Sequence, residues 1–325
     1  MVRSACNLFR VAIACAAAAV AFNVSAQTPG SLDTSFGGTG SVVTPVSPST
    51  GDDRASSMVV QPDGKIVVGG GCENDFCMVR YLPNGSLDST FGSGGKVTQS
   101  LLGNDSANAM ALQPDDKLVL VGACRLPNST DGRMCAARFT ATGALDTTFG
   151  AGVGWVTVNV TGGGDSARAV ALQSDGRIVM AGACAELFGG TGSDFCLARL
   201  NASGLIDTTF GTAGIIVNTF GGGNVAQGAF AVVVEANRFI VVAGYCQVGS
   251  YDSFCVARYV ANGSMLDNTF GGGTGVVTTQ VAASVNTRAY GLAYQPDGKI
   301  LVSGECGSVP CAVRYLSTGV LDASF

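Results

Sequence analysis

Short apolar runs separated by turn residues make up most of this chain, and helical periodicity is nearly absent after the first 26 residues. One unit contains four such runs, at residues 95–101, 107–113, 117–124 and 135–140. Asp-Gly and Asn-Gly dipeptides, which favour two-residue hairpin turns, stand between runs of this kind, as at Asp63-Gly64 and Asn84-Gly85. The pattern predicts an all-β chain of antiparallel hairpins.

A repeated marker divides the chain into units. It reads LDxxF, or IDxxF in one copy, and its aspartates are Asp33, Asp88, Asp146, Asp207, Asp267 and Asp322. Successive markers lie 55 to 61 residues apart, so five full units separate six markers. Four antiparallel strands repeated five times predict a five-bladed β-propeller made from one domain, residues 27–325.

The order of strands within a blade follows from one run that carries small residues at alternate positions. Ala107, Ala109 and Ala111 show this pattern, and two other units repeat it. Blades converge at the axis of a propeller, so a face of small residues fits the innermost strand. We expect this strand to be followed outward by the run after the QPDG turn, the run containing the repeated arginine, and a short Gly-x-Val-x-Thr strand.

The two ends of the chain predict how the ring closes. The last unit lacks a fourth strand, and Gly40–Val46 is a fourth strand without a blade. We therefore expect Val42 and Val43 to pair with residues 311–316, which would remove two sheet edges. Six markers then compete for five positions, and we expect Asp322 to pair with Arg314 while residues 32–36 are displaced.

Each unit carries an arginine eight or nine residues before its marker aspartate. The expected ion pairs are Arg80 with Asp88, Arg138 with Asp146, Arg199 with Asp207, Arg258 with Asp267, and Arg314 with Asp322. A half-buried guanidinium favours a carboxylate partner. A catalytic role would require five equivalent sites or one special copy, and no copy is special. The marker phenylalanine is interpreted as a wedge between blades, with ligand stacking as the alternative.

Ten cysteines remain after residue 26, two in each unit. The expected disulfides join Cys72 with Cys77, Cys124 with Cys135, Cys184 with Cys196, Cys246 with Cys255, and Cys306 with Cys311. Each pair flanks the connection between the second and third strands. Zinc is disfavoured because the pairs belong to separate blades and the chain has no histidine. A redox-active pair at residues 72–77 is the alternative.

The segments QPDGKIVV (61–68) and VRYLPNGSLDSTFGSGG (79–95) resemble the delta-60 repeat, a bacterial β-propeller repeat. The resemblance extends over nearly the whole chain after residue 26. It implies the propeller fold and little about function. The cysteine pair in each unit is an addition to the repeat pattern.

Residues 1–26 have the features of a cleavable secretory signal: Arg3 and Arg10, a short apolar core, and small residues before Gln27. A lipoprotein anchored at Cys15 is the alternative. Removing the signal changes the net charge from −5 to −7, which disfavours binding to nucleic acids or anionic membranes. No later stretch is apolar enough to span a bilayer. We expect a periplasmic or secreted monomer.

Three functions remain open. Loops of different length and chemistry on a rigid scaffold favour a binding module for a protein or glycan. A structural surface protein is the first alternative. A glycosidase-like enzyme is the second, although no catalytic motif is recognisable and histidine-dependent chemistry is excluded. Its candidate carboxylates are the unrepeated Glu73, Asp131, Glu186, Asp194, Glu235, Asp252 and Glu305.

No cofactor is expected, with one exception. Asp53, Asp105 and Asp165 precede the inner strand in successive units and are weak candidates for Ca²⁺ ligands. Asn224 and Asn286 lie in this region of the other two units. The alternative is that the aspartates cap the ends of these strands.

Overall fold

The computed structural model describes residues 30–47, 51–185, 192–220, 225–235 and 238–325, so the expected signal peptide lies outside it. The described chain is all-β apart from one short 3₁₀ turn, η1 (Gly271–Gly273). Its strands form five antiparallel sheets, of which four have four strands and one has three. No helix in these residues is long and apolar enough to cross a membrane.

The sheets follow one another along the chain and are called blades 1 to 5. Blade 1 contains β1 (Asp53–Val60), β2 (Ile66–Cys72), β3 (Asp75–Tyr81) and β4 (Lys96–Gln99). Blade 2 contains β5 (Asn104–Leu112), β6 (Leu118–Arg125), β7 (Arg133–Phe139) and β8 (Trp155–Val158). Blade 3 contains β9 (Ser166–Leu172), β10 (Ile178–Ala185), β11 (Ser193–Leu200) and β12 (Ile215–Asn218). Blade 4 contains β13 (Gly228–Glu235), β14 (Phe239–Val248), β15 (Tyr251–Val260) and β16 (Val276–Thr279). Blade 5 contains β17 (Thr287–Tyr294), β18 (Ile300–Cys306) and β19 (Val309–Tyr315).

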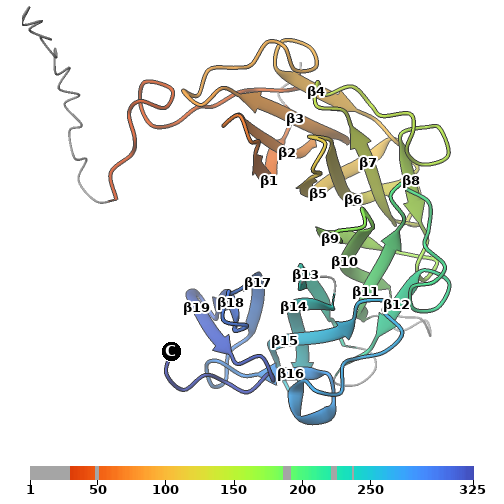
Figure 1. Cartoon of the computed structure of the whole chain (residues 1–325), viewed down its shortest axis with the longest axis vertical. Coiled ribbons are helices and arrows are strands. Elements are labelled where there is room, and N and C mark those ends of the chain that lie inside the picture. The colour runs from red at the N-terminus through yellow and green to blue at the C-terminus, as the bar shows by residue number, and fades with distance from the viewer. Residues whose placement is uncertain (1–29, 48–50, 186–191, 221–224, 236–237) are drawn as a thin grey trace, which may run out of the picture.

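The blades are arranged as an open arc, with the first strand of each blade along its inner curve (Figure 1). The strand order within each blade is the expected one. The core lies between neighbouring blades, in four clusters of buried apolar side chains. A fully buried marker phenylalanine belongs to each cluster: Phe91, Phe149, Phe210 and Phe270. These phenylalanines are therefore wedges between blades.

A β-bulge interrupts every inner strand and corrects the expected small face. In blade 2, Ala107 pairs with Gly122 and Ala109 with the adjacent Val121, so Asn108 is the extra residue. Ala107 consequently packs toward blade 1, whereas Ala109 packs toward blade 3. Strict alternation placed both alanines on one face, and this prediction was wrong because a bulge shifts the register by one residue. The other bulged residues are Ser56, Arg168, Phe230 and Tyr290.

A glycine in each second strand makes room for the bulge. These glycines are Gly70, Gly122, Gly182, Gly244 and Gly304, and each stands two residues before the first cysteine of its unit. A Cβ atom at any of them would lie 1.8–1.9 Å from a carbonyl oxygen of the inner strand. The bulge and the glycine therefore occur together as one structural feature in all five blades.

The expected pairing of residues 311–316 with Val42 and Val43 is not present. Blade 5 has three strands, and residues 40–46 are not in a strand but run beside blade 1, at the other end of the arc. Figure 1 shows the two ends of the arc well separated. Asp322 takes Arg314, as expected. The first marker, residues 32–36, does not take this position, also as expected: Asp33 accepts hydrogen bonds from Ser35, residues 31–35 are exposed, and the following Gly37 bonds blade 1.

Three contacts place residues 37–46 where the last strand of a preceding blade belongs. The amide of Gly37 donates to the carbonyl of Asn84 (2.8 Å), as Gly271 does to Thr318 between blades 4 and 5. The hydroxyl of Tyr81 donates to Thr44 (2.8 Å), just as Tyr315 does to Thr279. The third contact is from the amide of Val46 to Asp53 (2.8 Å). Residues 37–46 thus lie against blade 1 where the last strand of a preceding blade would lie, although they form no strand themselves.

We predict that Gly70→Ala destabilises the protein by about 3 kcal/mol, because the new methyl group would collide with the bulge carbonyl of Arg54. Gly69→Ala is the matched control in the same strand, since its Cβ would meet only ordinary contacts, the nearest at 3.5 Å. Urea unfolding measures both variants. Equal losses of stability in the two would contradict the proposed role of Gly70.

Candidate functional site

The repeated arginine and aspartate form a buried ion pair in four blades. The Nε atom of the arginine lies 2.7–2.9 Å from the carboxylate in Arg80–Asp88, Arg138–Asp146, Arg199–Asp207 and Arg258–Asp267. A fifth pair, Arg314–Asp322, has the same geometry at 2.8 Å, but 20% of the arginine side chain is exposed. The other four arginine side chains are 3–7% exposed.

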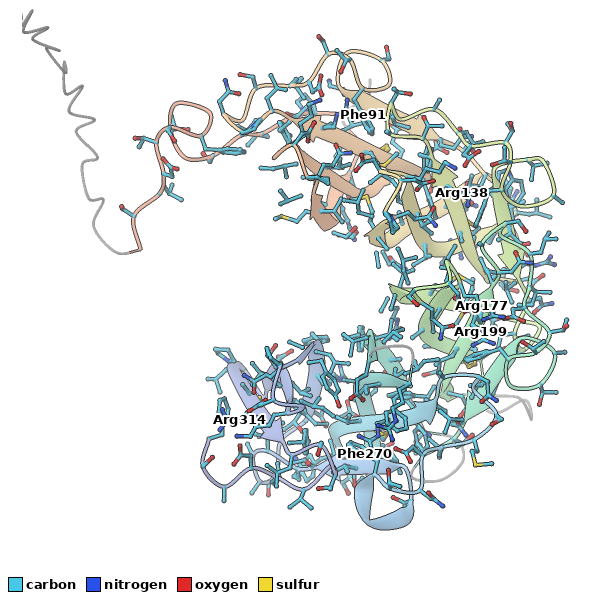
Figure 2. The ribbon with its side chains drawn as sticks, in the orientation of Figure 1. Phe91, Arg138, Arg177, Arg199, Phe270 and Arg314 are labelled. Atoms are coloured by element: carbon cyan, nitrogen blue, oxygen red, sulfur yellow. A yellow bond between two sulfur atoms is a disulfide. The ribbon has the colours of Figure 1, made fainter. Side chains whose placement is uncertain are left out.

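Each of the four buried arginines also binds the next blade. Its Nη1 donates to a hairpin carbonyl there, as Arg138 does to Ala202 at 2.7 Å. The equivalent acceptors are Ala141, Ala261 and Ser317. The guanidinium carbon lies 4.5–4.7 Å from the ring centre of the marker phenylalanine in these blades. Figure 2 shows that Arg138, Arg199 and Phe270 lie in the outer part of the arc, away from its inner curve. The repeated polar residues therefore join blades.

The cysteines lie in five pairs at disulfide distance, with Cα atoms 5.5–5.9 Å apart. The two members of a pair are diagonal across the strands rather than directly opposite. In blade 3, Cys196 faces Gly182 and Cys184 faces Asp194. The glycine that accommodates the bulge therefore also faces the second cysteine. Each disulfide consequently lies next to a bulge, at the same end of the blade.

The loops closed by these cysteine pairs are shorter than expected. In blades 1, 4 and 5 only two residues separate the strands, for example Gly249 and Ser250. The connection is longer in blade 2 (126–132) and in blade 3 (186–192), most of which lies outside the described residues. Variation in the length of the connections between second and third strands is therefore concentrated in blades 2 and 3. The connections from each fourth strand to the next inner strand open at the same end of the blades, which we call the disulfide face.

Most of the unrepeated carboxylates are engaged in separate contacts. Asp131 pairs with Arg133 (2.8 Å) and Asp252 with Arg288 (2.6 Å). Asp194 accepts a hydrogen bond from Thr219 (2.7 Å). Glu73 and Glu235 come from blades 1 and 4, and Glu186 lies outside the described residues. Asp131, Asp194 and Asp252 thus have three different partners.

The three aspartates considered for calcium serve separate loops. Asp105 accepts hydrogen bonds from the amides of residues 101–103 (2.7–3.1 Å), and Asp165 from those of residues 160 and 161. Asp53 holds residues 46 and 47 in the same way. The arrangement is that of strand-end caps. Within the described residues no three His, Cys, Asp or Glu side chains form a group that could hold a metal ion. Asn224 is not described, and Asn286 accepts from the amide of Asp252.

The bulged side chains form a second set of candidate residues, and the sequence analysis missed it. They differ in every blade: Ser56, Asn108, Arg168, Phe230 and Tyr290. Several contact the next inner strand. Asn108 donates to the carbonyl of Ala167 (2.8 Å), and Arg168 lies over the ring of Phe230. The rings of Phe230 and Tyr290 meet edge to face, 5.0 Å apart. We call these five residues the inner rim.

A groove of about 680 Å³ lies on the face of blade 1 that is turned away from blade 2. It is lined by residues 42–44, by part of β1 and by Val68, Met78 and Tyr81. In the other blades the equivalent face is covered by the preceding blade. Met58 is 62% exposed here, whereas the equivalent Met110 is 8% exposed. The groove is therefore an uncovered contact surface between blades.

Comparison with known proteins finds a similarity that recurs along the chain. Residues 61–91, 113–149, 173–210 and 295–325 match a family described as a β-propeller domain of unknown function, DUF5122. The corresponding stretch of blade 4 lies outside the matched ranges. No curated protein matches the chain significantly.

Solved structures of similar shape are distant in sequence. A structure of YCF48 bound to D1 peptide has 11% identity and a TM-score of 0.44, covering 87% of this chain and 70% of that one. A Lactobacillus plantarum protein has 12% identity and a TM-score of 0.48, with 82% and 69% covered. An exo-1,5-α-L-arabinanase from a bovine ruminal metagenomic library has 13% identity and a TM-score of 0.38, with 84% and 97% covered.

The ion pairs predict how stability depends on pH. The hydrogen bond from the Thr90 hydroxyl, the Thr90 amide and the charge of Arg80 lower the pKa of Asp88 to about 2. Burial raises the pKa of Asp146, but the hydrogen bonds from Thr148 and the charge of Arg138 outweigh it and lower that pKa to about 2. A lowered carboxyl pKa stabilises the fold above the unfolded value of about 4, and the stabilisation is lost as the pH falls toward 2.

We therefore expect the melting temperature to fall steeply between about pH 4 and pH 2. At pH 7, Asp146→Asn should cost about 3–5 kcal/mol because it leaves Arg138 buried and unpaired. Asp115→Asn is the matched control on the same blade. Its exposed pair with Lys117 (3.1 Å) should contribute less than about 1 kcal/mol. Calorimetry and urea unfolding test this. Similar losses in both variants, or an unchanged melting temperature at pH 2, would contradict it.

Proposed function

We propose that this protein is an exported five-bladed scaffold that binds a protein or glycan through its disulfide face. The observation that carries the proposal is that the repeated and the unrepeated side chains lie at opposite ends of the blades and make different contacts. The repeated arginines, aspartates and phenylalanines join blades. The unrepeated bulged residues and the two longer loops collect at the other end of the blades. Sequence variation on a fixed frame is the general arrangement of binding proteins.

Export is supported by the cysteines. Five pairs at disulfide distance suit an oxidising compartment, and the sequence of residues 1–26 has the features expected of a secretory signal. The same repeated segments that resemble the delta-60 repeat coincide with those that match the propeller family. An enzyme of glycosidase type finds less support, because several of the unrepeated carboxylates are held in separate ion pairs or hydrogen bonds.

We also propose that the arc closes into a ring. Residues 40–46 lie against blade 1 at the position of a fourth strand, and β19 is the edge strand of blade 5. By equivalence with blade 4, where Cys255 faces Thr278, closure would bring Val43 opposite Cys311 and Val42 opposite Ala312. Closure would also bring the carbonyl of Pro83 to Arg314, which lacks the next-blade acceptor that the other four arginines have.

Ring closure predicts that Val42→Pro reduces amide protection in β19, since proline removes a donor from the new ladder. The equivalent Val277 is in a hydrogen-bonded pair with Val256, because the pairs alternate from the bond that the amide of Arg258 donates to Gly275. In the open arc residues 40–46 pair with no strand, so the same substitution would leave β19 unchanged. Val42→Ala is the control for loss of the side chain alone. Hydrogen exchange of residues 309–315 decides between the two, and unchanged protection there in Val42→Pro would contradict closure.

The binding function predicts that shortening one long loop abolishes binding without unfolding the protein. Residues 126–132 can be replaced by the two-residue turn found at Gly249 and Ser250, which leaves Cys124 and Cys135 in place. The probes are arrays of oligosaccharides and of synthetic peptides. Asp297→Asn, on a turn at the opposite end of blade 5, is the control. The proposal fails if nothing binds, or if both variants lose binding equally. A structural surface protein would give the first result.

A further inference from the structure

The inner rim is formed by a backbone feature that repeats in every blade, whereas the side chain that this feature displays does not repeat. Every inner strand has a bulge, and every second strand has a glycine opposite it. Glycine inside a strand weakens it, so this feature has a cost in stability. The displayed side chain nevertheless changes from blade to blade: serine, asparagine, arginine, phenylalanine, tyrosine. Bulges re-aim side chains next to functional sites, and this pattern indicates display rather than packing.

In blades 3 to 5 the rim becomes one aromatic and cationic surface. The guanidinium of Arg168 lies 4.4 Å above the ring of Phe230. Phe230 meets Tyr290 edge to face and stacks on Tyr245 at 5.8 Å. Arg288 in turn lies 4.9 Å above the ring of Tyr245. Tyr290 is 43% exposed, which is unusual for a residue inside this contact network.

Arg168 differs from the other cations near the rim in having no counter-charge. Arg288 pairs with Asp252 (2.6 Å) and Arg54 with Asp52 (3.1 Å). Among the described residues no carboxylate lies within salt-bridge distance of Arg168, and its buried Nη1 has no hydrogen-bond acceptor. The buried Nη1 is out of a ligand's reach, but Arg168 as a whole is only half-buried, so its unbalanced charge favours an anionic ligand. Its planar fork matches a carboxylate.

Tyr290 adds the groups that a sugar requires. Its exposed ring offers a flat apolar surface for the C–H face of a pyranose. Its hydroxyl lies 3.4 Å from a carboxylate oxygen of Glu305, so a donor and an acceptor stand at the edge of that surface. Hydroxyl groups of a sugar need both kinds of partner. A single unpaired arginine in a chain of net negative charge does not suit a polyphosphate backbone.

We propose that Arg168, Phe230 and Tyr290 bind a saccharide that carries a carboxylate, with the carboxylate at Arg168 and the sugar ring on the aromatic pair. This inference rests on the proposed binding function and names its ligand class. It places the specificity on the inner rim, at the disulfide end of the blades, rather than on the long loops alone.

The test is calorimetric titration of the full chain with tetragalacturonate and with its methyl ester, which keeps the sugar and removes the charge. We expect the free acid to bind at least tenfold more tightly than the ester. Arg168→Met should remove that difference, because it keeps a long side chain over Phe230 without the charge. Tyr290→Ala should weaken both ligands at least tenfold. Asp297→Asn, on a turn at the opposite end of blade 5, should leave both affinities unchanged.

Thermal unfolding of each variant separates loss of binding from loss of fold, and Arg168→Lys provides a second variant that retains the charge and should retain part of the discrimination. Equal binding of acid and ester, or an unchanged affinity in Arg168→Met, overturns the carboxylate assignment. Binding of array peptides or neutral sugars without any binding of tetragalacturonate overturns this inference and leaves the proposed function standing. Absence of binding to every probe overturns both.

Discussion

The contact from each third-strand arginine to the next blade is the interaction on which the arrangement of blades depends. Arg138 bonds its own Asp146, stacks on Phe149 and donates to the carbonyl of Ala202. One buried cation thus fixes the connector and the angle at which the following blade meets it. Burial of a guanidinium is favourable only when its donors are satisfied, so the three partners must be present together. This requirement explains why arginine, aspartate and phenylalanine recur as a unit.

The same interaction explains why the ends of the arc differ from its middle. Arg314 has Asp322 and Phe325 but no following blade, and Phe325 is 63% exposed where Phe91, Phe149, Phe210 and Phe270 are fully buried. At the other end, blade 1 holds residues 37–46 through the contacts that a preceding blade would make. In the ring closure proposed above, these two ends would form one further interface of the same kind. Apolar surface left exposed on both ends favours their association.

The sequence predicted the parts that depend on local spacing. The marker period gave five units, the strand order followed from the run of small residues, and the spacing of eight or nine residues brought Arg80 and its equivalents to their aspartates. It did not reveal the carbonyl acceptors in the next blade, because these depend on the angle between blades. It also missed the bulges, because alternation with a period of two was assumed. A signal was present: a glycine two residues before the first cysteine in all five units.

That glycine connects stability to the proposed site. In blade 3, Gly182 faces the inner strand at the bulge on one side and Cys196 on the other. A side chain at this position would collide with the carbonyl of Ser166, and the strands could pair only if the bulge were lost. Without the bulge, Arg168 would turn from the rim into an interface between blades. The glycine and the cysteine pair beside it thus keep one end of each blade fixed, while the bulged residue remains free to change. A repeat protein can in this way alter what it binds, blade by blade, without altering the contacts that hold its blades together.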